Sequence, residues 1–143
     1  MLQNSNPRET FNLAILEGAK FALPTLRVHV RAYAGERDRG GGLCFALTDT
    51  DNYRVVYWDA LRNVVVLGQV SGGELHELRA GGIGEVAPGW HELGVAVHGD
   101  RLRAYFDRVE VTSITVHAPV LSGQVGLWTR GDAATWFDEL RVY

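Results

Sequence analysis

Aromatic and basic side chains are the residues of this sequence whose chemistry best suits a ligand. An aromatic ring can pack against the C–H face of a sugar ring while polar groups beside it bind the hydroxyls. We predict that the ligand-binding residues are His29, Arg31, Arg54, Trp58, Trp128 and Trp136, lining one concave surface. Trp58 is the best candidate, because it lies with Arg54 on what we interpret as the non-core face of one strand. For each tryptophan, packing in the core or at a sheet edge is the alternative.

Other reactive side chains do not fall into a catalytic or metal-binding pattern. The five histidines form no H-x-H or H-x-x-x-H pair, so their spacing does not predict a zinc site. Asp49 and Asp51 fall in a predicted turn, and Glu74 and Glu77 flank a predicted loop, so they do not supply the paired carboxylates of a glycosidase. Cys44 alternates with apolar neighbours, which favours a buried, inert thiol. The chain is therefore more typical of a binding protein than of an enzyme.

The overall composition limits the classes of partner. The chain has 143 residues, with 14 Lys and Arg against 17 Asp and Glu, and a formal net charge of -3. That balance does not favour nucleic acid, because phosphate binding needs a concentration of positive charge. No apolar stretch predicts a membrane span, no signal peptide is visible, and a single cysteine excludes an internal disulfide. We expect one domain over residues 1–143, with residues 1–10 as a loose N-terminal segment.

A two-residue alternation of apolar and polar side chains dominates the sequence from Leu26 onward. Such alternation is typical of half-buried β-strands, and residues 26–33 place Leu26, Val28 and Val30 on one face. Turn-forming residues separate the runs, and the 17 glycines agree with many reversals of the chain. About ten to twelve short strands at regular spacing predict two packed antiparallel sheets. Only residues 9–20 have a pattern that is compatible with a short helix.

Four blocks of the sequence carry a more specific signal, and they occur in a fixed order. The blocks are FNLAILEGAKF (11–21), GGGLCFALTDTDNYRVVYWDAL (40–61), APGWHELGVAVHGDRLRAYFD (87–107) and SGQVGLWTRGDAATWFDELRV (122–142). Together they resemble the concanavalin A-like lectin/glucanase superfamily, and most closely the laminin-G-like jelly-roll domains related to the 3-keto-disaccharide hydrolase group. The resemblance implies an all-β, two-sheet antiparallel jelly-roll sandwich whose concave sheet binds carbohydrate in some relatives.

The same resemblance implies a function and a setting. It implies a non-catalytic binding or accessory module for carbohydrate, in an extracytoplasmic compartment of a bacterium. A glycoside-acting enzyme of the 3-keto-glycoside hydrolase type is one alternative, and a structural sandwich that self-associates as a homodimer is another. Jelly rolls of this kind often hold a structural calcium ion through a carboxylate near the last strand, where Asp138 lies in this sequence. A capping or turn role for Asp138 is the alternative to metal binding.

Overall fold

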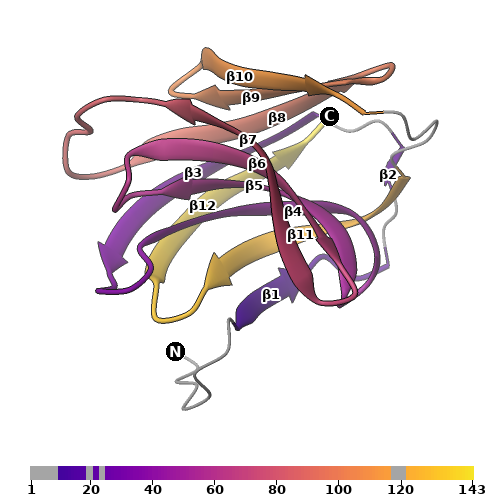
Figure 1. The fold of residues 1–143 in the computed structure, drawn as a ribbon, viewed down its shortest axis with the longest axis horizontal. Coiled ribbons are helices and arrows are strands. Elements are labelled where there is room, and N and C mark those ends of the chain that lie inside the picture. Colours follow the sequence, from indigo (N-terminus) through magenta and orange to yellow (C-terminus); the bar gives the residue numbers. More distant parts are fainter. Residues whose placement is uncertain (1–9, 19–20, 23–24, 117–121) are drawn as a thin grey trace.

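The computed structural model describes residues 10–18, 21–22, 25–116 and 122–143 (Figure 1). Every regular element in these residues is a β-strand, and the strands form two antiparallel sheets. The predicted all-β, two-sheet fold class is thus confirmed. None of the described residues belongs to a helix that could cross a membrane. The predicted loose segment 1–10 lies outside the described residues, apart from Thr10.

The larger sheet has seven strands, with six of them in the spatial order β1-β11-β4-β5-β6-β7 and β2 paired to β11. Its strands are β1 (Phe11–Ile15), β2 (Phe21–Ala22), β4 (Gly40–Asp49), β5 (Asn52–Asp59), β6 (Val64–Ser71), β7 (Glu74–Gly82) and β11 (Ser122–Arg130). Strands β4 to β7 are joined by short turns, as the sequence predicts. Strand β11 comes from near the end of the chain and inserts between β1 and β4.

The smaller sheet has five strands in the order β10-β9-β8-β3-β12. Its strands are β3 (Thr25–Ala34), β8 (His91–His98), β9 (Arg101–Phe106), β10 (Val109–Thr115) and β12 (Ala134–Val142). Figure 1 shows β3 and β12, from opposite ends of the chain, side by side in this sheet. The chain passes from the larger sheet to the smaller sheet between β2 and β3, and again between β11 and β12.

A hydrophobic core fills the space between the sheets. The apolar positions of the alternating runs point inward from both layers, including Leu26, Val28 and Val30 of β3 as predicted. From the larger sheet, Val56 and Trp58 of β5 join the same core. Burial of apolar surface of this kind is the main favourable contribution to folding.

The outer face of the larger sheet is also apolar at its centre. A second cluster there consists of buried side chains from β4, β5, β6 and β11, namely Cys44, Leu47, Tyr53, Val55, Tyr57, Val66, Val70 and Trp128. Strands β1 and β7 contribute partly buried neighbours such as Phe11 and Leu75. Both faces of the central strands are therefore buried, whereas most sandwich sheets leave one face to solvent.

The expectation of a short helix within residues 9–20 is wrong. Residues 11–15 form β1, which pairs antiparallel with β11 from Phe11 opposite Arg130 to Ile15 opposite Gly126. The pattern misled because Phe11, Leu13 and Ile15 pack on the outer cluster while the intervening residues face away. Pairing with β11 gives this short edge segment ladder hydrogen bonds along one side, whereas an isolated helix of the same length is marginal in water.

Candidate functional site

The turn between β5 and β6 holds a guanidinium group at the margin of the larger sheet. Asp59 ends β5, and one of its carboxylate oxygens accepts hydrogen bonds from the backbone N–H groups of Leu61 and Arg62, each at 3.1 Å. Aspartate commonly closes a turn onto the backbone in this way. The other oxygen accepts a hydrogen bond from Nε of Arg62 at 2.7 Å. One carboxylate therefore fixes both the turn and the direction of the arginine side chain.

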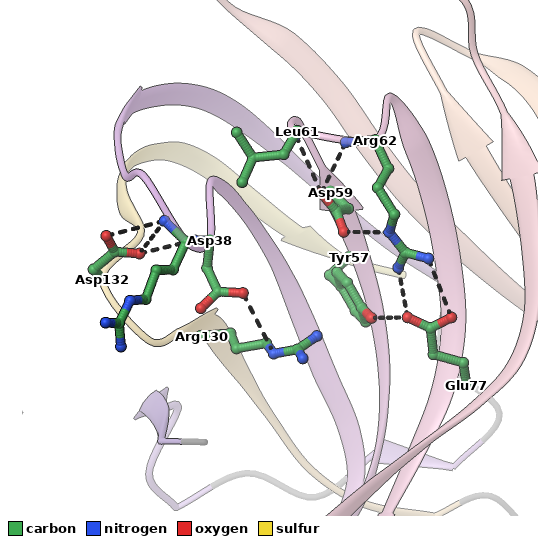
Figure 2. A network of polar contacts seen from close by, with 9 residues as sticks. Asp38, Tyr57, Asp59, Leu61, Arg62, Glu77, Arg130 and Asp132 are labelled. Carbon is green, nitrogen blue, oxygen red and sulfur yellow. Dashed lines mark hydrogen bonds and ion pairs between the residues drawn. The ribbon is translucent and has the colours of Figure 1, made fainter. Parts of the chain in front are cut away.

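Arg62 reaches from this turn to a second carboxylate, on β7. Its Nη2 atom donates to Oε1 of Glu77 at 2.5 Å, and the hydroxyl of Tyr57 donates to the same oxygen at 3.0 Å. Figure 2 shows that Asp59, Arg62, Glu77 and Tyr57 form one continuous network. The Arg62 side chain is 49% exposed and that of Glu77 is 39% exposed. Both groups are thus held in place by protein contacts while remaining open to a ligand.

The network sets the charge of its members. Burial by itself would raise the pKa of Glu77, but hydrogen bonds from Arg62 and Tyr57 outweigh it and lower that pKa. Hydrogen bonds to Glu77 and Asp59 raise the pKa of Arg62, and burial, followed by the negative charge of Glu77, raises the pKa of Tyr57. At neutral pH the site therefore presents an ionised Glu77 beside a charged Arg62 and a neutral phenol.

A second ion pair lies at the adjacent end of β11. Nε of Arg130 is 3.5 Å from Oδ1 of Asp38, which belongs to the loop between β3 and β4. The carboxylate of Asp132 holds this loop by accepting hydrogen bonds from the backbone N–H groups of Glu36 at 2.9 Å, Arg37 at 3.2 Å and Asp38 at 2.8 Å. Figure 2 shows Asp132 beside Asp38, and Asp38 facing Arg130. These backbone bonds lower the pKa of Asp132. Two loops that are far apart in sequence thereby present one ion pair.

Gly131 allows this loop contact. Its φ of 56° lies in the left-handed region, which glycine adopts at little cost. A Cβ at this position would overlap with Oδ2 of Asp38. The absence of a side chain therefore lets the Asp38 carboxylate approach the backbone next to Arg130.

Aromatic rings pack beside the ion pairs on the outer face of the larger sheet. The Trp128 ring lies 4.8 Å from the Tyr57 ring and 5.4 Å from the Phe11 ring, and its indole N–H donates to the Tyr53 hydroxyl at 2.9 Å. Gly42 is the register partner of both Trp128 and Tyr57, and having no side chain it lets the two rings meet across β4. Trp128 is only 1% exposed. This cluster is thus a rigid support for the polar groups rather than an open stacking surface.

We call the charged groups of this region the charged patch, which consists of the exposed Arg62 and Glu77 and the partly buried Asp38, Asp59 and Arg130. The nearby cavity, which Asp38, Asp59 and Arg130 help to line, has a volume of about 20 Å³. A space of that size holds roughly one water molecule. A larger ligand therefore has to bind on the solvent side of the charged patch. Its carboxylates and guanidinium groups offer the acceptors and donors that ligand hydroxyls require.

The predicted ligand residues do not share one surface, and the predicted orientation of Trp58 is wrong. Trp58 points into the core between the sheets, is 5% exposed, and packs against the rings of Phe106 at 5.3 Å and His91 at 5.6 Å. Arg54 lies on the same inward side of β5, at the opposite end of the strand from Asp59. The error arose because both faces of β5 are buried, so alternation alone did not tell which face meets the other sheet.

The other predicted residues gather on the smaller sheet. In the register of β3 and β12, Arg31 pairs with Trp136 and His29 pairs with Asp138, so these four residues share the outer face of that sheet. The two ring nitrogens of His29 lie 3.6 Å from carboxylate oxygens of Glu92 and Glu139. The adjoining groove has a volume of about 340 Å³ and is lined by His29, Trp90, His91, Glu92, Asp107 and Arg108. Only Trp128, of the predicted set, lies on the outer face of the larger sheet.

Asp138 is an exposed residue whose carboxylate accepts a hydrogen bond from the backbone N–H of Glu139 at 2.9 Å. This contact is of the turn type that the sequence left open as an alternative. Within the described ranges, no group of three or more His, Cys, Asp or Glu side chains is placed to hold a metal ion. Structural calcium at Asp138 stays a prediction.

Solved structures of other proteins share this architecture. A carbohydrate-binding module, CBM66 from Bacillus subtilis, matches with a TM-score of 0.80 and 21% identity over 94% of this chain and 81% of that chain. The fold is a concanavalin A-like jelly roll. Sheep galectin-11 matches this jelly roll with a TM-score of 0.61 and 10% identity, over 97% of this chain and 100% of that chain. An endo-β-1,3-glucanase from Pyrococcus furiosus matches with a TM-score of 0.63 and 12% identity, over 89% and 63% of the two chains.

No protein-family model matches the sequence, and no curated protein matches it. The jelly roll confirms the predicted fold class, and its structural neighbours include a carbohydrate-binding module, a galectin and a glucanase. At these sequence identities the likeness concerns the fold.

Sequence reasoning missed most of the charged patch. Asp59 and Arg62 are three residues apart in WDALRN, a spacing that suits an aspartate turn and was a usable signal. The partnership of Arg62 with Glu77 depends on the pairing of β6 with β7, and that of Arg130 with Asp38 joins residues far apart in the chain. Neither contact has a local pattern in the sequence.

Proposed function

We propose that this protein is a non-catalytic carbohydrate-binding module that binds its saccharide on the charged patch. The observation that carries the proposal is the network in which Arg62 is held between two carboxylates, Asp59 and Glu77, on the outer side of a jelly-roll sheet. The fold is shared with a carbohydrate-binding module and with galectins, and this supports carbohydrate as the ligand class.

The chemistry of the patch suits sugar hydroxyls. A hydroxyl both donates and accepts, so it pairs with a carboxylate on one side and a guanidinium on the other. Arg62 and Glu77 keep free hydrogen-bonding capacity on their exposed sides. Because Asp59 and Tyr57 already fix these two side chains, little side-chain entropy is lost when a saccharide binds. The patch is therefore preorganised for a polyhydroxylated ligand.

The same groups argue for binding rather than hydrolysis. A glycosidase needs one carboxylic acid with a raised pKa to protonate the leaving oxygen. In this site the pKa of Glu77 is lowered, and Asp59 is committed to Arg62 and to the turn. The finer resemblance to the 3-keto-disaccharide hydrolase group stays a prediction, as do the homodimer and the extracytoplasmic location.

The test is a glycan array followed by calorimetric titration of the best saccharide. We expect Arg62→Gln and Glu77→Gln each to weaken binding about tenfold or more, because each change removes a charged hydrogen-bond partner. Arg103→Gln is the matched control, since Arg103 is 45% exposed and forms one ion pair, with Glu110 at 3.5 Å, on the other sheet. It should bind like the unchanged protein.

Two outcomes would contradict the proposal. One is that no glycan binds to the folded protein. The other is that Arg62→Gln binds normally while Arg108→Gln does not, which would place the saccharide in the groove of the smaller sheet beside His29.

A further inference from the structure

A pocket lies where the edge strands of the two sheets, β7 and β10, pack against each other. Its volume is about 570 Å³, within the usual range for small-molecule sites. Its lining residues come from both sheets and are Arg54, Gln69, Leu78, Arg79, Arg101, Ser113, Ile114, Thr115 and Val116. We call it the arginine pocket.

The arginine pocket concentrates positive charge in a protein that is acidic overall. Arg54, Arg79 and Arg101 come from β5, β7 and β9, and no aspartate or glutamate among the described residues belongs to the lining. The chain as a whole has a formal net charge of -3. Three guanidinium groups around one pocket without a carboxylate create a local positive potential that favours an anion.

Two of these arginines lack a protein acceptor. Neither Arg54 nor Arg79 forms a hydrogen bond or ion pair in the part of the chain that the structure describes. Arg54 is half-buried, and burial lowers its pKa. Partial removal of a guanidinium from water is costly unless an acceptor replaces the water. The structure therefore bears a cost at Arg54 that a bound anion would remove.

The arginine pocket has a polar side and an apolar side. Arg101 donates from Nη2 to the Ser113 hydroxyl at 2.9 Å, which holds its guanidinium on the β10 side. Leu78 and Ile114 add apolar surface, and Leu78 is 42% exposed. A ligand that combines a charged group with a carbon skeleton would contact both sides.

We propose that the arginine pocket binds a small organic oxyanion. Its carboxylate, sulfate or phosphate group accepts hydrogen bonds from Arg54, Arg79 and Arg101, and its carbon skeleton packs on Leu78 and Ile114. Guanidinium groups bind these oxyanions through paired N–H donors.

This site is separate from the charged patch. Arg54 and Asp59 lie on opposite faces of β5 and are about 17 Å apart along the strand, from five residues at the usual rise. The anion site therefore does not rest on the proposed saccharide site, and either can fail alone.

The test uses the folded protein and a series of probes that share size but differ in charge. Glucuronate, inorganic phosphate and inorganic sulfate are titrated in low-salt buffer, with neutral glucose as the uncharged counterpart. Binding is followed by the ¹⁵N–¹H signals of the arginine Nε–H groups. We expect a saturable shift of the Arg54 and Arg79 signals with at least one anion and none with glucose, and we expect added salt to weaken the binding. A preference for glucuronate over both inorganic anions would identify the carbon skeleton as part of the ligand.

Variants make the assignment specific. Arg54→Gln should weaken anion binding about tenfold to hundredfold, as expected for the loss of a charged hydrogen-bond partner. Arg103→Gln should leave it unchanged, because Arg103 is an exposed arginine that lies outside both proposed sites. Absence of saturable binding for all three anions, or equal binding by Arg54→Gln and the unchanged protein, would overturn the proposal.

A measurement without ligand separates a binding role of Arg54 from a structural one. If Arg54 serves the ligand, Arg54→Met should melt at the same temperature as the unchanged protein or higher, because an unpaired half-buried charge is lost. The anion should then raise the melting temperature of the unchanged protein and not that of Arg54→Met. A melting temperature several degrees lower for Arg54→Met without ligand would show that the side chain supports the sandwich, and would refute the inference.

Discussion

Replacement of Asp132 by asparagine tests how the charged patch is held. The Asp132 carboxylate accepts backbone hydrogen bonds from three consecutive residues, 36–38, at 2.8 to 3.2 Å. A hydrogen bond to a charged group contributes about 1.5–3 kcal/mol when it is shielded from water. Because Asp132 is exposed, solvent screening reduces each bond to roughly 0.5 kcal/mol. We therefore expect Asp132→Asn to lower the free energy of unfolding by about 1–2 kcal/mol.

The destabilisation caused by Asp132→Asn should depend on pH. The backbone bonds lower the pKa of Asp132 below its ordinary value of 3.8 in the folded state. The stabilisation is therefore complete above about pH 4 and is lost as the pH falls through the lowered folded pKa. The difference in unfolding free energy between the unchanged protein and Asp132→Asn should be largest near pH 6 and should shrink between about pH 4 and pH 2.

Urea denaturation at a series of pH values measures this difference. The urea midpoint of Asp132→Asn should fall while the slope m stays constant. Glu85→Gln is the control, because Glu85 is exposed and takes part in no hydrogen bond or ion pair within the described residues. A difference that keeps the same size from pH 6 to pH 2 would refute the reasoning, since it would not depend on the ionised carboxylate.

Three further predictions follow from the packing around the site. Gly131→Ala should lower the free energy of unfolding by about 1–2 kcal/mol in urea, since its φ is positive and the new Cβ overlaps with Asp38; unchanged stability would contradict this. Burial raises the pKa of the Cys44 thiol to about 12, so a thiol reagent at pH 8 should label only the urea-unfolded protein. Labelling at the same rate in the folded state would contradict the burial. Trp128→Phe should cost about 2–3 kcal/mol, because it leaves a cavity and an unpaired Tyr53 hydroxyl; a smaller loss than for Trp136→Phe, an exposed tryptophan, would refute it.

The strands and the fold were predictable because their signals are local. Alternation marks each strand of the smaller sheet correctly, and the turns at Gly72 and Gly99 fall where the sequence indicates. The helix expected over residues 9–20 failed because β1 is stabilised by its partner β11, over a hundred residues away. Local preference could not report that pairing.

The site was harder to predict because it depends on the orientation of β5. Strands β4, β5 and β6 are buried on both faces, so apolar side chains occur at successive positions. The apolar pattern therefore does not indicate which face points toward the other sheet. Choosing the wrong face placed Trp58 outside, whereas its ring lies in the core between the sheets. The same choice hid the charged patch, since its residues follow Tyr57 on the outer face.

The register of β5 also links the two proposed sites. Its outward residues lead to Asp59 and the charged patch, and its inward residues include Arg54 of the arginine pocket. A slip of one residue would exchange the two faces and destroy both sites. Side chains fix the turns at both ends of β5 and so disfavour a slip. Asp49 accepts a hydrogen bond from the side-chain amide of Asn52 at 2.9 Å in the turn before β5, and Asp59 closes the turn after it. The two aspartate turns therefore bound the strand whose opposite faces contribute to the charged patch and to the arginine pocket.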